Sequence, residues 1–299
     1  MVQSNMKKLL LIINPVTARL AVTPHMIDIV DIFENGGYDV TVHISKAKGE
    51  VRSFVKENGN LFDTVVCAGG DGTLNETISG VLAIAEKKPK IGYIPAGTTN
   101  DFATSWGIPK KPLDAARAIV ETSPMKTDIS TFCGRPFVYV AAFGAFTEAS
   151  YSTPQELKKS LGWAAYILEG FKSIPSIRPW RMKISYDGGE VDGEFLYGMI
   201  SNTRRVGGFN LKLKDDISLS DGLMELMLVK KPSNSADNGK LISALLAQDF
   251  SSEFIVFEHT KNIHFTSTEE LPWTVDGESG GAMFEGDGGI LESAVELFL

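Results

Sequence analysis

Residues 69–73 read Gly-Gly-Asp-Gly-Thr, and this segment constrains the fold more than any other part of the chain. An apolar run typical of a buried strand precedes it at residues 63–68, and a helical pattern follows it from Leu74. A strand that turns through adjacent glycines into a helix directs backbone N–H groups and the positive end of the helix dipole at one point, which suits a phosphate chain. Asp71 adds a carboxylate that can hold Mg²⁺ beside phosphates. The segment is not a Walker A loop, because no Gly-Lys-Ser/Thr follows.

The first 130 residues alternate between strand-like and helix-like segments. Apolar runs predict strands at residues 8–14, 38–45, 63–68 and 90–95. Periodicity and capping residues predict helices at residues 23–36, 51–58, 73–86 and 111–120. Regular alternation of this kind predicts an α/β domain, in which helices cover both faces of a parallel sheet and ligands bind at the carboxyl ends of its strands.

The sequence changes character after Asp128, where short runs of Val, Ile, Phe, Tyr and Met are separated by turn signals. These runs predict strands at residues 135–143, 181–186, 194–201, 222–229, 254–257 and 262–266, with helices near 155–171 and 238–248. Asp-Gly pairs at 187–188, 276–277 and 287–288 are typical of turns. We therefore expect an α/β domain over residues 1–130 and a mainly antiparallel β-sandwich domain over 131–299, with the last ten or so residues returning to the first domain.

Composition restricts the class of partner and the compartment. A net charge of −8 argues against nucleic acid as the main partner. Two cysteines, Cys67 and Cys133, give no disulfide framework and favour a reducing cytoplasm. The apolar run at residues 9–13 is too short for a signal peptide and stops at Asn14, so it is interpreted as the first strand. No segment approaches the roughly 20 apolar residues that span a bilayer.

Three further motifs follow the glycine-rich segment along the chain. Residues 95–101 read Pro-Ala-Gly-Thr-Thr-Asn-Asp after the next predicted strand, so they should lie at the same edge of the sheet. Asp128 begins the crossover to the second half, and residues 273–278 read Trp-Thr-Val-Asp-Gly-Glu. Together with Leu-Asn-Glu at 74–76, this ordered set resembles the diacylglycerol kinase catalytic-domain family, specifically its soluble bacterial lipid kinases, over essentially the whole chain. Sphingosine and ceramide kinases are more distant relatives.

The resemblance implies a fold of the NAD kinase/diacylglycerol kinase type, in which ATP binds between an α/β domain and a β-sandwich domain. It implies a nucleotide-binding set in the first half of the chain: Asn14, Arg19, Ser45, Gly69, Gly70, Gly72, Thr73, Asn75, Glu76, Gly97 and Thr98. It also implies that Asp71, Asp101 and Asp128 hold a catalytic Mg²⁺ through water. Three converging carboxylates would repel one another without a cation, so charge favours a metal as well.

Two further assignments come from the same resemblance. Asp221, with backbone oxygens of Ser218 and Leu223, would bind a structural Mg²⁺ in the second domain. Glu278 or Asp276 would accept the proton of the attacking hydroxyl, so the catalytic set is Glu278, Asp276 and Asp71. The first loop departs from the family pattern Asn-Pro-x-Ser/Ala-Gly-Lys, because residues 14–19 read Asn-Pro-Val-Thr-Ala-Arg. Arg19 presents a planar guanidinium where the family has an ammonium group.

Three functions remain open on the sequence alone. The leading hypothesis is a lipid kinase that uses ATP and Mg²⁺, with diacylglycerol as the default acceptor and phosphatidic acid as the product. A NAD kinase is the second, because NAD kinases use similar glycine-rich loops. A lipid- or nucleotide-binding protein that has lost catalysis is the third, suggested by Arg19. The expected partner is a lipid reached by peripheral contact at the inner face of the membrane; a homodimer is left open, and residues 157–174 are either a membrane-touching helix or a packing helix.

Overall fold

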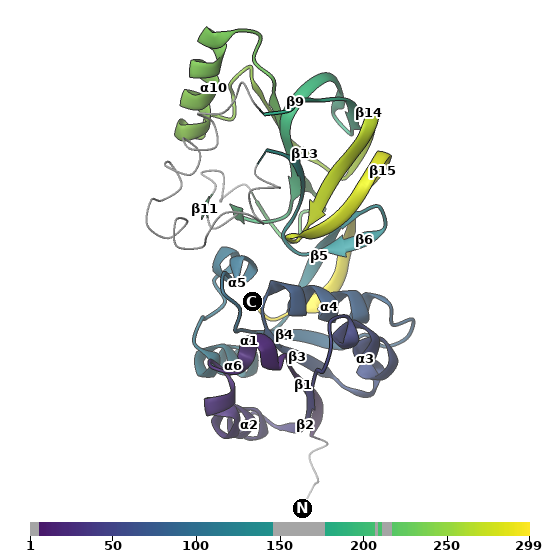
Figure 1. Ribbon diagram of the computed structural model, residues 1–299. Helices are drawn as coiled ribbons and strands as arrows, with labels where there is room; N and C mark the ends of the chain where they lie inside the picture. Colours follow the sequence, from purple (N-terminus) through teal and green to yellow (C-terminus); the bar gives the residue numbers. More distant parts are fainter. Residues whose placement is uncertain (1–5, 146–176, 207–208, 211–216) are drawn as a thin grey trace, which may run out of the picture. The chain divides into compact units, whose positions relative to one another are not determined.

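The computed structural model describes residues 6–145, 177–206, 209–210 and 217–299 (Figure 1). The chain divides into two compact units. One, the α/β unit, comprises Met1–Ile129, Leu219–Asp221 and Leu291–Leu299, and the other, the β-rich unit, comprises Ser130–Ser218 and Gly222–Ile290. Two strands, β5 (Met125–Phe132) and β15 (Glu278–Leu297), contain residues of both units. In the described part of the chain no helix is long and apolar enough to cross a membrane.

The α/β unit is built on parallel strands in the order β2-β1-β3-β4. Their bounds are β1 (Lys7–Ile13), β2 (Tyr38–Ile44), β3 (Thr64–Gly69) and β4 (Lys90–Pro95). The end of β15 continues the sheet beside β4, with Leu297 opposite Ile91. The helices are α1 (Pro15–Ala18), α2 (Met26–Asn35), α3 (Glu50–Asn58), α4 (Asp71–Leu82), α5 (Asp101–Trp106) and α6 (Pro112–Glu121), with short 3₁₀ turns at Thr23–His25 and Gly59–Leu61.

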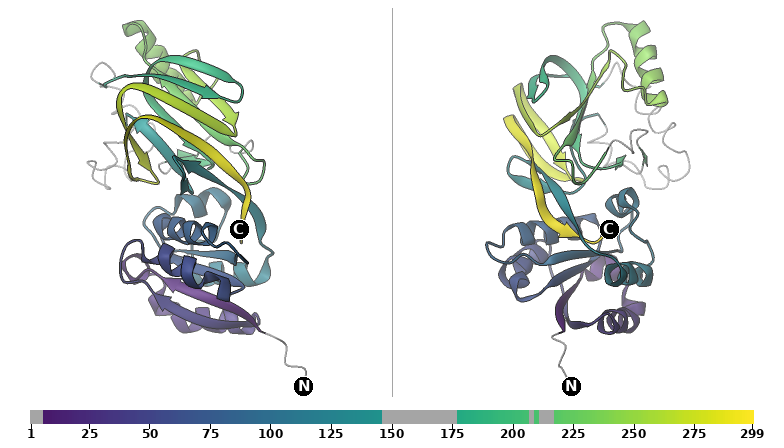
Figure 2. Two further views of the ribbon diagram at one scale, coloured as in Figure 1. Left: turned by 90° about the vertical axis from the view of Figure 1, so that its right-hand side faces the viewer. Right: turned by 180° about the vertical axis from the view of Figure 1, so that it is seen from behind.

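Helices cover both faces of this sheet (Figures 1 and 2). Successive side chains of a strand point to opposite faces. Val66 and Ala68 of β3 belong to a buried cluster that includes residues of α2 and α6. Cys67, between them, is hydrogen-bonded by Thr77 of α4 and therefore lies on the other face. All three β3 side chains are fully buried, which explains why the strand reads as a continuous apolar run in the sequence.

The α/β unit differs from the sequence prediction at several element ends. Helix α4 begins two residues earlier than predicted, at Asp71, and ends at Leu82 rather than at residue 86. Helices α1 and α5 and strand β5 were not predicted. Helix α5 has only six residues, and backbone N–H groups of its first turn are bound by a side chain from α4, described below. Sequence periodicity cannot detect a helix that is stabilised by such a distant partner.

The β-rich unit is mainly antiparallel. Its elements are β6 (Arg135–Phe137), β7 (Val140–Gly144), β8 (Trp180–Tyr186), β9 (Gly189–Ser201), β10 (Arg205–Val206), β11 (Phe209–Asn210), β12 (Met224–Lys230), α10 (Ser235–Ala247), β13 (Ile255–Thr260) and β14 (Asn262–Val275). Strands β9 and β14 each pair with both β7 and β8, so these four strands close a hydrogen-bonded circuit. The sequence predicts a β-sandwich for this unit. In the structure β14 pairs with β8 over residues 263–267 and with β7 over residues 273–275. A register shift between Thr266 and Leu271 separates these two parts of β14.

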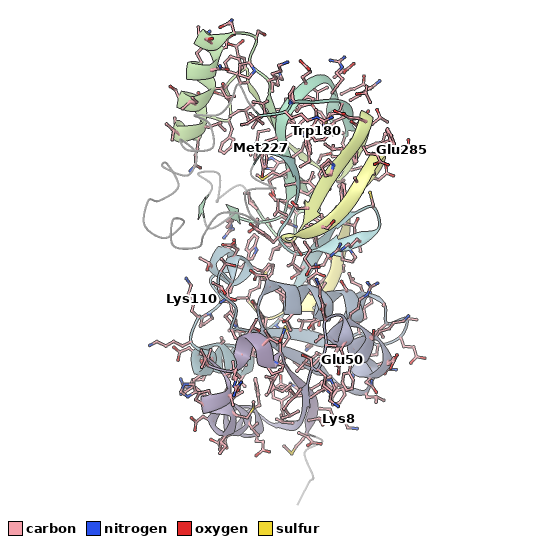
Figure 3. All side chains as sticks on the ribbon, in the orientation of Figure 1. Lys8, Glu50, Lys110, Trp180, Met227 and Glu285 are labelled. Carbon is pink, nitrogen blue, oxygen red and sulfur yellow. The ribbon has the colours of Figure 1, made fainter. Side chains whose placement is uncertain are left out.

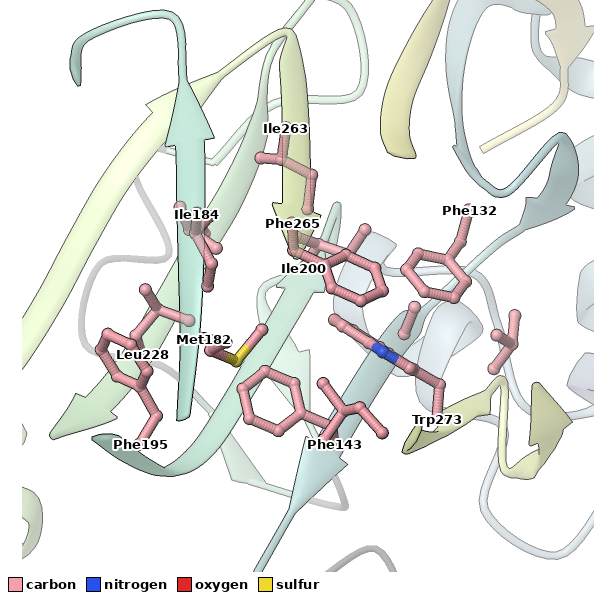
Figure 4. Close-up of a cluster of buried hydrophobic side chains, with 14 of the residues drawn as sticks. Phe132, Phe143, Met182, Ile184, Phe195, Ile200, Leu228, Ile263, Phe265 and Trp273 are labelled. Atoms are coloured by element: carbon pink, nitrogen blue, oxygen red, sulfur yellow. The ribbon is translucent and has the colours of Figure 1, made fainter. Parts of the chain in front are cut away.

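Aromatic and aliphatic side chains share the core of this unit (Figure 4). The ring of Trp273 lies 4.3 Å from that of Phe132, 4.9 Å from that of Phe143 and 5.0 Å from that of Phe265, measured between centroids. Burying several large rings in mutual contact supplies much of the hydrophobic stabilisation of a small β domain. Trp273 lies three residues before Asp276, so the core fixes the strand that leads to a candidate catalytic turn.

Three predictions about the second half of the chain were wrong in detail. The predicted strand 135–143 is divided into β6 and β7, because backbone N–H groups around its break bind the Asp276 side chain. Residues 278–297 form the long strand β15, which the many glycines and polar residues concealed. The Asp287-Gly288 pair lies inside β15 rather than at a turn: a Cβ at Gly288 would meet Ile200 and Ile263 at 2.8 Å, so glycine is needed for close packing. The predicted helix at 155–171 lies outside the described residues.

Candidate functional site

The glycine-rich segment forms the junction between β3 and α4, and Gly70 is the N-cap of the helix. Its backbone lies against Gly97 of the loop that follows β4: a Cβ added at Gly97 would meet the Gly70 Cα at 2.7 Å and Asn100 Oδ1 at 2.8 Å. The two predicted loops are therefore in contact, and the contact requires glycine. Space is open over Gly72, in the first turn of α4, where a Cβ would meet nothing within 4 Å. The first N–H groups of a helix lack partners within the helix, so this open turn can bind an anion.

Asn14 connects the end of β1 to the start of α4. Its Nδ2 donates to Thr73 Oγ1 at 3.0 Å, and its Oδ1 accepts from the Val16 N–H at 3.0 Å and so caps α1. Thr73 is buried. Asn14 and Thr73 therefore hold the loop after β1 against the glycine-rich turn, and Asn14 serves the local structure through both ends of its amide.

Asp71 joins the two glycine-containing loops. Its Oδ2 accepts from the Asp101 N–H at 2.9 Å, and the Phe102 N–H and the Tyr93 hydroxyl also donate to its carboxylate. Burial raises the pKa of Asp71, and these hydrogen bonds oppose the rise. Burial of the Tyr93 hydroxyl, together with the negative charge of Asp71, raises the pKa of Tyr93. Asp71 is thus a half-buried carboxylate that caps α5 and places Asp101 beside itself.

A second pair of carboxylates fixes the loop after β2. Glu76 Oε1, on α4, accepts from the Gly49 N–H at 2.9 Å. Glu50, on α3 (Figure 3), accepts from the N–H groups of Lys46 at 2.6 Å and Ala47 at 3.1 Å. These bonds, led by the one from Lys46, lower the pKa of Glu50. Ser45, a predicted nucleotide-binding residue, begins this loop and is buried. Sequence reasoning missed Glu50, although its partners Lys46 and Ala47 lie only four and three residues before it.

The remaining predicted nucleotide contacts differ in exposure. Thr98 and Arg19 are exposed, and Arg19 is the C-cap of the four-residue helix α1. Asn75 Oδ1 accepts from the Ser79 hydroxyl at 3.3 Å, within α4. The structure therefore brings Asn14, Gly69, Gly70, Gly72, Thr73 and Gly97 together around one junction, while Thr98 and Arg19 present their side chains to solvent.

Asp128 and the 218–223 segment are linked to the end of the chain. Asp128, on β5, is buried; its Oδ1 accepts from the Ser293 N–H at 2.6 Å, and its own N–H donates to the Leu219 oxygen at 2.6 Å. Asp221 is exposed and belongs to the α/β unit, whereas Ser218 and Leu223 belong to the β-rich unit. Asp128 therefore has a structural role, because its carboxylate binds the backbone of the C-terminal strand β15.

The donor set for a metal ion is limited. Across the residues described, no three His, Cys, Asp or Glu side chains group closely enough to hold a metal directly. The Asp71 carboxylate accepts from the backbone N–H of Asp101, and both residues are at least half-buried. A cation near them would offset the cost of burying negative charge. These two residues fit an ion held through water, the form in which Mg²⁺ usually binds.

The β-rich unit contributes the turn between β14 and β15. Asp276 and Gly277 have φ angles of 50° and 78°, which identify a two-residue hairpin turn of the primed type. The Asp276 carboxylate accepts from three backbone N–H groups, those of Val138 at 2.9 Å, Tyr139 at 3.0 Å and Val140 at 3.1 Å. Its oxygens are engaged in holding the chain between β6 and β7. Asp276 is therefore poorly placed to accept a proton, and Glu278 is the better candidate.

Glu278 begins β15, and its side chain is 44% exposed. Arg135, on β6, lies beside it: Arg135 Nη2 is 3.4 Å from Glu278 Oε2, and Arg135 Nη1 donates to the Ser279 oxygen at 3.2 Å. Sequence reasoning missed Arg135, which lies 143 residues before Glu278. No local pattern marks a partner that only the pairing of distant strands brings into contact.

These features define a class of protein in which a glycine-rich strand-to-helix turn carries an internal aspartate, and a separate β-rich unit carries an exposed glutamate. The sequence model of the family described as the diacylglycerol kinase catalytic domain matches residues 8–132 of this chain. The chain is 35% identical over 280 residues to a diacylglycerol kinase of Bacillus subtilis (strain 168), covering 93% of this chain and 92% of the relative. It is 34% identical over 284 residues to a diacylglycerol kinase of Staphylococcus aureus (strain Newman), covering 93% and 88%.

Solved structures show the same fold. A diacylglycerol kinase from Bacillus anthracis str. Sterne superposes with a TM-score of 0.77 at 24% identity, covering 99% of this chain and 98% of the other. Another crystal structure from that organism gives a TM-score of 0.80 at 24% identity, with coverage of 99% and 96%. The chain belongs to the diacylglycerol kinase catalytic-domain family.

Proposed function

We propose that this protein is a lipid kinase that transfers the γ-phosphoryl group of ATP to the hydroxyl of a lipid, with diacylglycerol as the acceptor and phosphatidic acid as the product. The observation that carries the proposal is the contact between the two glycine-containing loops at Gly70 and Gly97, with Asp71 bound to the start of α5. This arrangement offers backbone N–H groups and an adjacent carboxylate to a phosphate chain. Kinship with diacylglycerol kinases supports the choice of acceptor.

The chain's own residues divide the work between the two units. In the α/β unit, the first turn of α4 at Gly72 binds phosphate oxygens, and Asn14 with Thr73 keeps that turn in place. Asp71 and Asp101 would hold a bound Mg²⁺ through its water shell, and the ion would supply positive charge to the phosphates. In the β-rich unit, Glu278 accepts the proton of the lipid hydroxyl, while Asp276 maintains the turn from which Glu278 projects.

The proposal includes the setting in which the reaction takes place. The acceptor is taken from a membrane by peripheral contact, in the cytoplasm and at the inner face of the bilayer. The NAD kinase alternative rests on the glycine-rich loop alone, whereas the kinship over more than nine tenths of the chain favours the lipid kinase. The alternative of a binding protein without catalysis rests on the replacement of the family's lysine by Arg19, which is exposed.

A lipid-panel kinase assay tests the proposal. Purified protein is incubated with γ-labelled ATP and Mg²⁺ together with mixed micelles that contain diacylglycerol, ceramide, sphingosine or monoacylglycerol, and with NAD in a separate arm. We expect labelled phosphatidic acid and matching ADP release in the diacylglycerol arm. Turnover with NAD alone would refute the lipid kinase. ATP binding with no ADP release in any arm would establish the non-catalytic alternative.

A further inference from the structure

Two short segments of the β-rich unit are clamped together next to the candidate base. Residues 135–140 and 276–279 are joined by the Asp276 carboxylate, which binds three consecutive N–H groups, and by the Asp276 N–H, which donates to the Val140 oxygen at 2.8 Å. Arg135 completes the connection at the other end through Ser279 and Glu278. The backbone on both sides of Glu278 is therefore fixed, and what remains to be fixed is its side chain.

The Arg135 guanidinium is well suited to that task. One nitrogen, Nη1, is anchored to the Ser279 backbone oxygen at 3.2 Å, so the group does not depend on Glu278 for its position. The other nitrogen, Nη2, is 3.4 Å from Glu278 Oε2. A planar guanidinium can address a backbone oxygen and a carboxylate at the same time, which the single ammonium of lysine does less well. This contact directs Oε2 of the Glu278 carboxylate toward the Arg135 guanidinium.

The exposure of the pair argues against a role in folding. The side chains of Arg135 and Glu278 are 45% and 44% exposed. Ion pairs this exposed contribute little to folding stability, because solvent screens them. A matching pair elsewhere in the same unit, Arg181 with Asp192 at 2.9 Å, has both side chains 53% exposed and lies on strands β8 and β9. It provides a control in which an arginine and a carboxylate pair without a catalytic candidate.

We propose that Arg135 is a positioning residue: it holds the ionised Glu278 carboxylate in the orientation that receives the proton of the acceptor hydroxyl. The inference rests on the proposed function, since it assigns Glu278 as the base. It separates the two acidic residues of the turn, with Asp276 and Arg135 holding the frame and Glu278 meeting the acceptor. Because Arg135 acts only through Glu278, removing it should lower kcat and leave the KM for ATP unchanged.

The test compares Arg135→Gln, Arg135→Lys, Glu278→Gln and the double variant Arg135→Gln/Glu278→Gln, with Arg181→Gln as the control. We expect Arg135→Gln to lower kcat roughly tenfold or more, the factor associated with losing a hydrogen bond to a charged group. Arg135→Lys should recover part of the loss, and Arg181→Gln should retain the wild-type kcat. In the Glu278→Gln background, Arg135→Gln should have no further effect, because two residues that act as one unit are not additive.

The outcomes separate this inference from the proposed function. If the unaltered protein phosphorylates no lipid, the proposed function fails and the inference fails with it. If the unaltered protein is active and Arg135→Gln has the same kcat, the inference alone is overturned. A further loss of activity when Arg135→Gln is added to Glu278→Gln would also overturn it, because Arg135 would then act on the reaction independently. Melting temperatures matching that of Arg181→Gln show that a lost rate does not reflect unfolding.

Discussion

Replacing Gly97 with alanine should damage the α/β unit and its nucleotide site together. The new Cβ would lie 2.7 Å from the Gly70 Cα and 2.8 Å from Asn100 Oδ1. Ordinary contact between carbon atoms begins at about 3.5 Å, so the two loops must separate by roughly 0.8 Å. Overpacking of this kind costs about 1–3 kcal/mol, which lowers the melting temperature of a unit of this size by roughly 3 to 10 °C. Displacing catalytic groups by about 1 Å can reduce kcat/KM up to 100-fold.

Gly72→Ala provides the opposite combination of effects. Gly72 lies in α4, and its Cβ would meet nothing within 4 Å. Alanine is favoured over glycine in a helix by roughly 0.5–1 kcal/mol, so this variant should melt at a slightly higher temperature. The added methyl group nevertheless occupies the space assigned to the phosphates. We therefore expect the Kd for ATP to rise at least about fivefold, from a steric cost of about 1 kcal/mol or more.

Calorimetric melting and titration with ATP distinguish the two variants, with Gly239→Ala as a matched control. Gly239 lies in α10 of the β-rich unit, and its Cβ would also meet nothing within 4 Å. It should gain stability like Gly72→Ala and bind ATP like the unaltered protein. Wild-type ATP affinity in Gly72→Ala would show that the phosphates do not lie over the start of α4. A Gly97→Ala variant with unchanged melting would refute the close approach of the two loops.

The remaining predictions concern charge, burial and capping. Burial raises the pKa of Asp71, so the folded state binds a proton more readily than the unfolded chain. The free energy of unfolding of the unaltered protein should therefore rise relative to that of Asp71→Asn as the pH falls through this pKa, while kinase activity is lost. A difference in unfolding free energy between these two proteins that does not depend on pH would contradict the burial of the carboxylate. Burial raises the pKa of Cys67 to about 12, whereas Cys133 is exposed, so iodoacetamide at pH 8 should label one thiol of the native protein, identified by peptide mass spectrometry as Cys133. Asn14→Ala should lower the free energy of unfolding by about 1–2 kcal/mol in chemical denaturation, because it removes the cap of α1 and the donor to Thr73; an unchanged midpoint would show that neither bond contributes.

The α/β unit could be predicted largely because its determinants are local. The β3 strand is apolar from Val65 to Ala68, and it leads through two glycines directly into α4. Such a transition is visible in a dozen consecutive residues. Short elements escaped prediction for the opposite reason: α5 depends on Asp71, thirty residues earlier, for its first N–H partner. The glycines of β15 suggested loops, yet at Gly288 the absent side chain is what allows Ile200 and Ile263 to pack.

The order of motifs along the chain was sufficient to indicate the family, the expected reaction and the set of candidate residues. The reason is that the chemical role of a glycine turn or a carboxylate follows from the residue type, which the sequence shows directly. From the sequence, Glu278 was the first choice as the base and Asp276 remained its alternative, and Arg135 was not singled out. Only the tertiary structure distinguishes them: strand pairing brings the N–H groups of residues 138–140 to Asp276 and the guanidinium of Arg135 to Glu278. Hydrogen-bond donors more than a hundred residues away decide which of the two carboxylates is engaged by the backbone. A local sequence pattern cannot show partners at that separation.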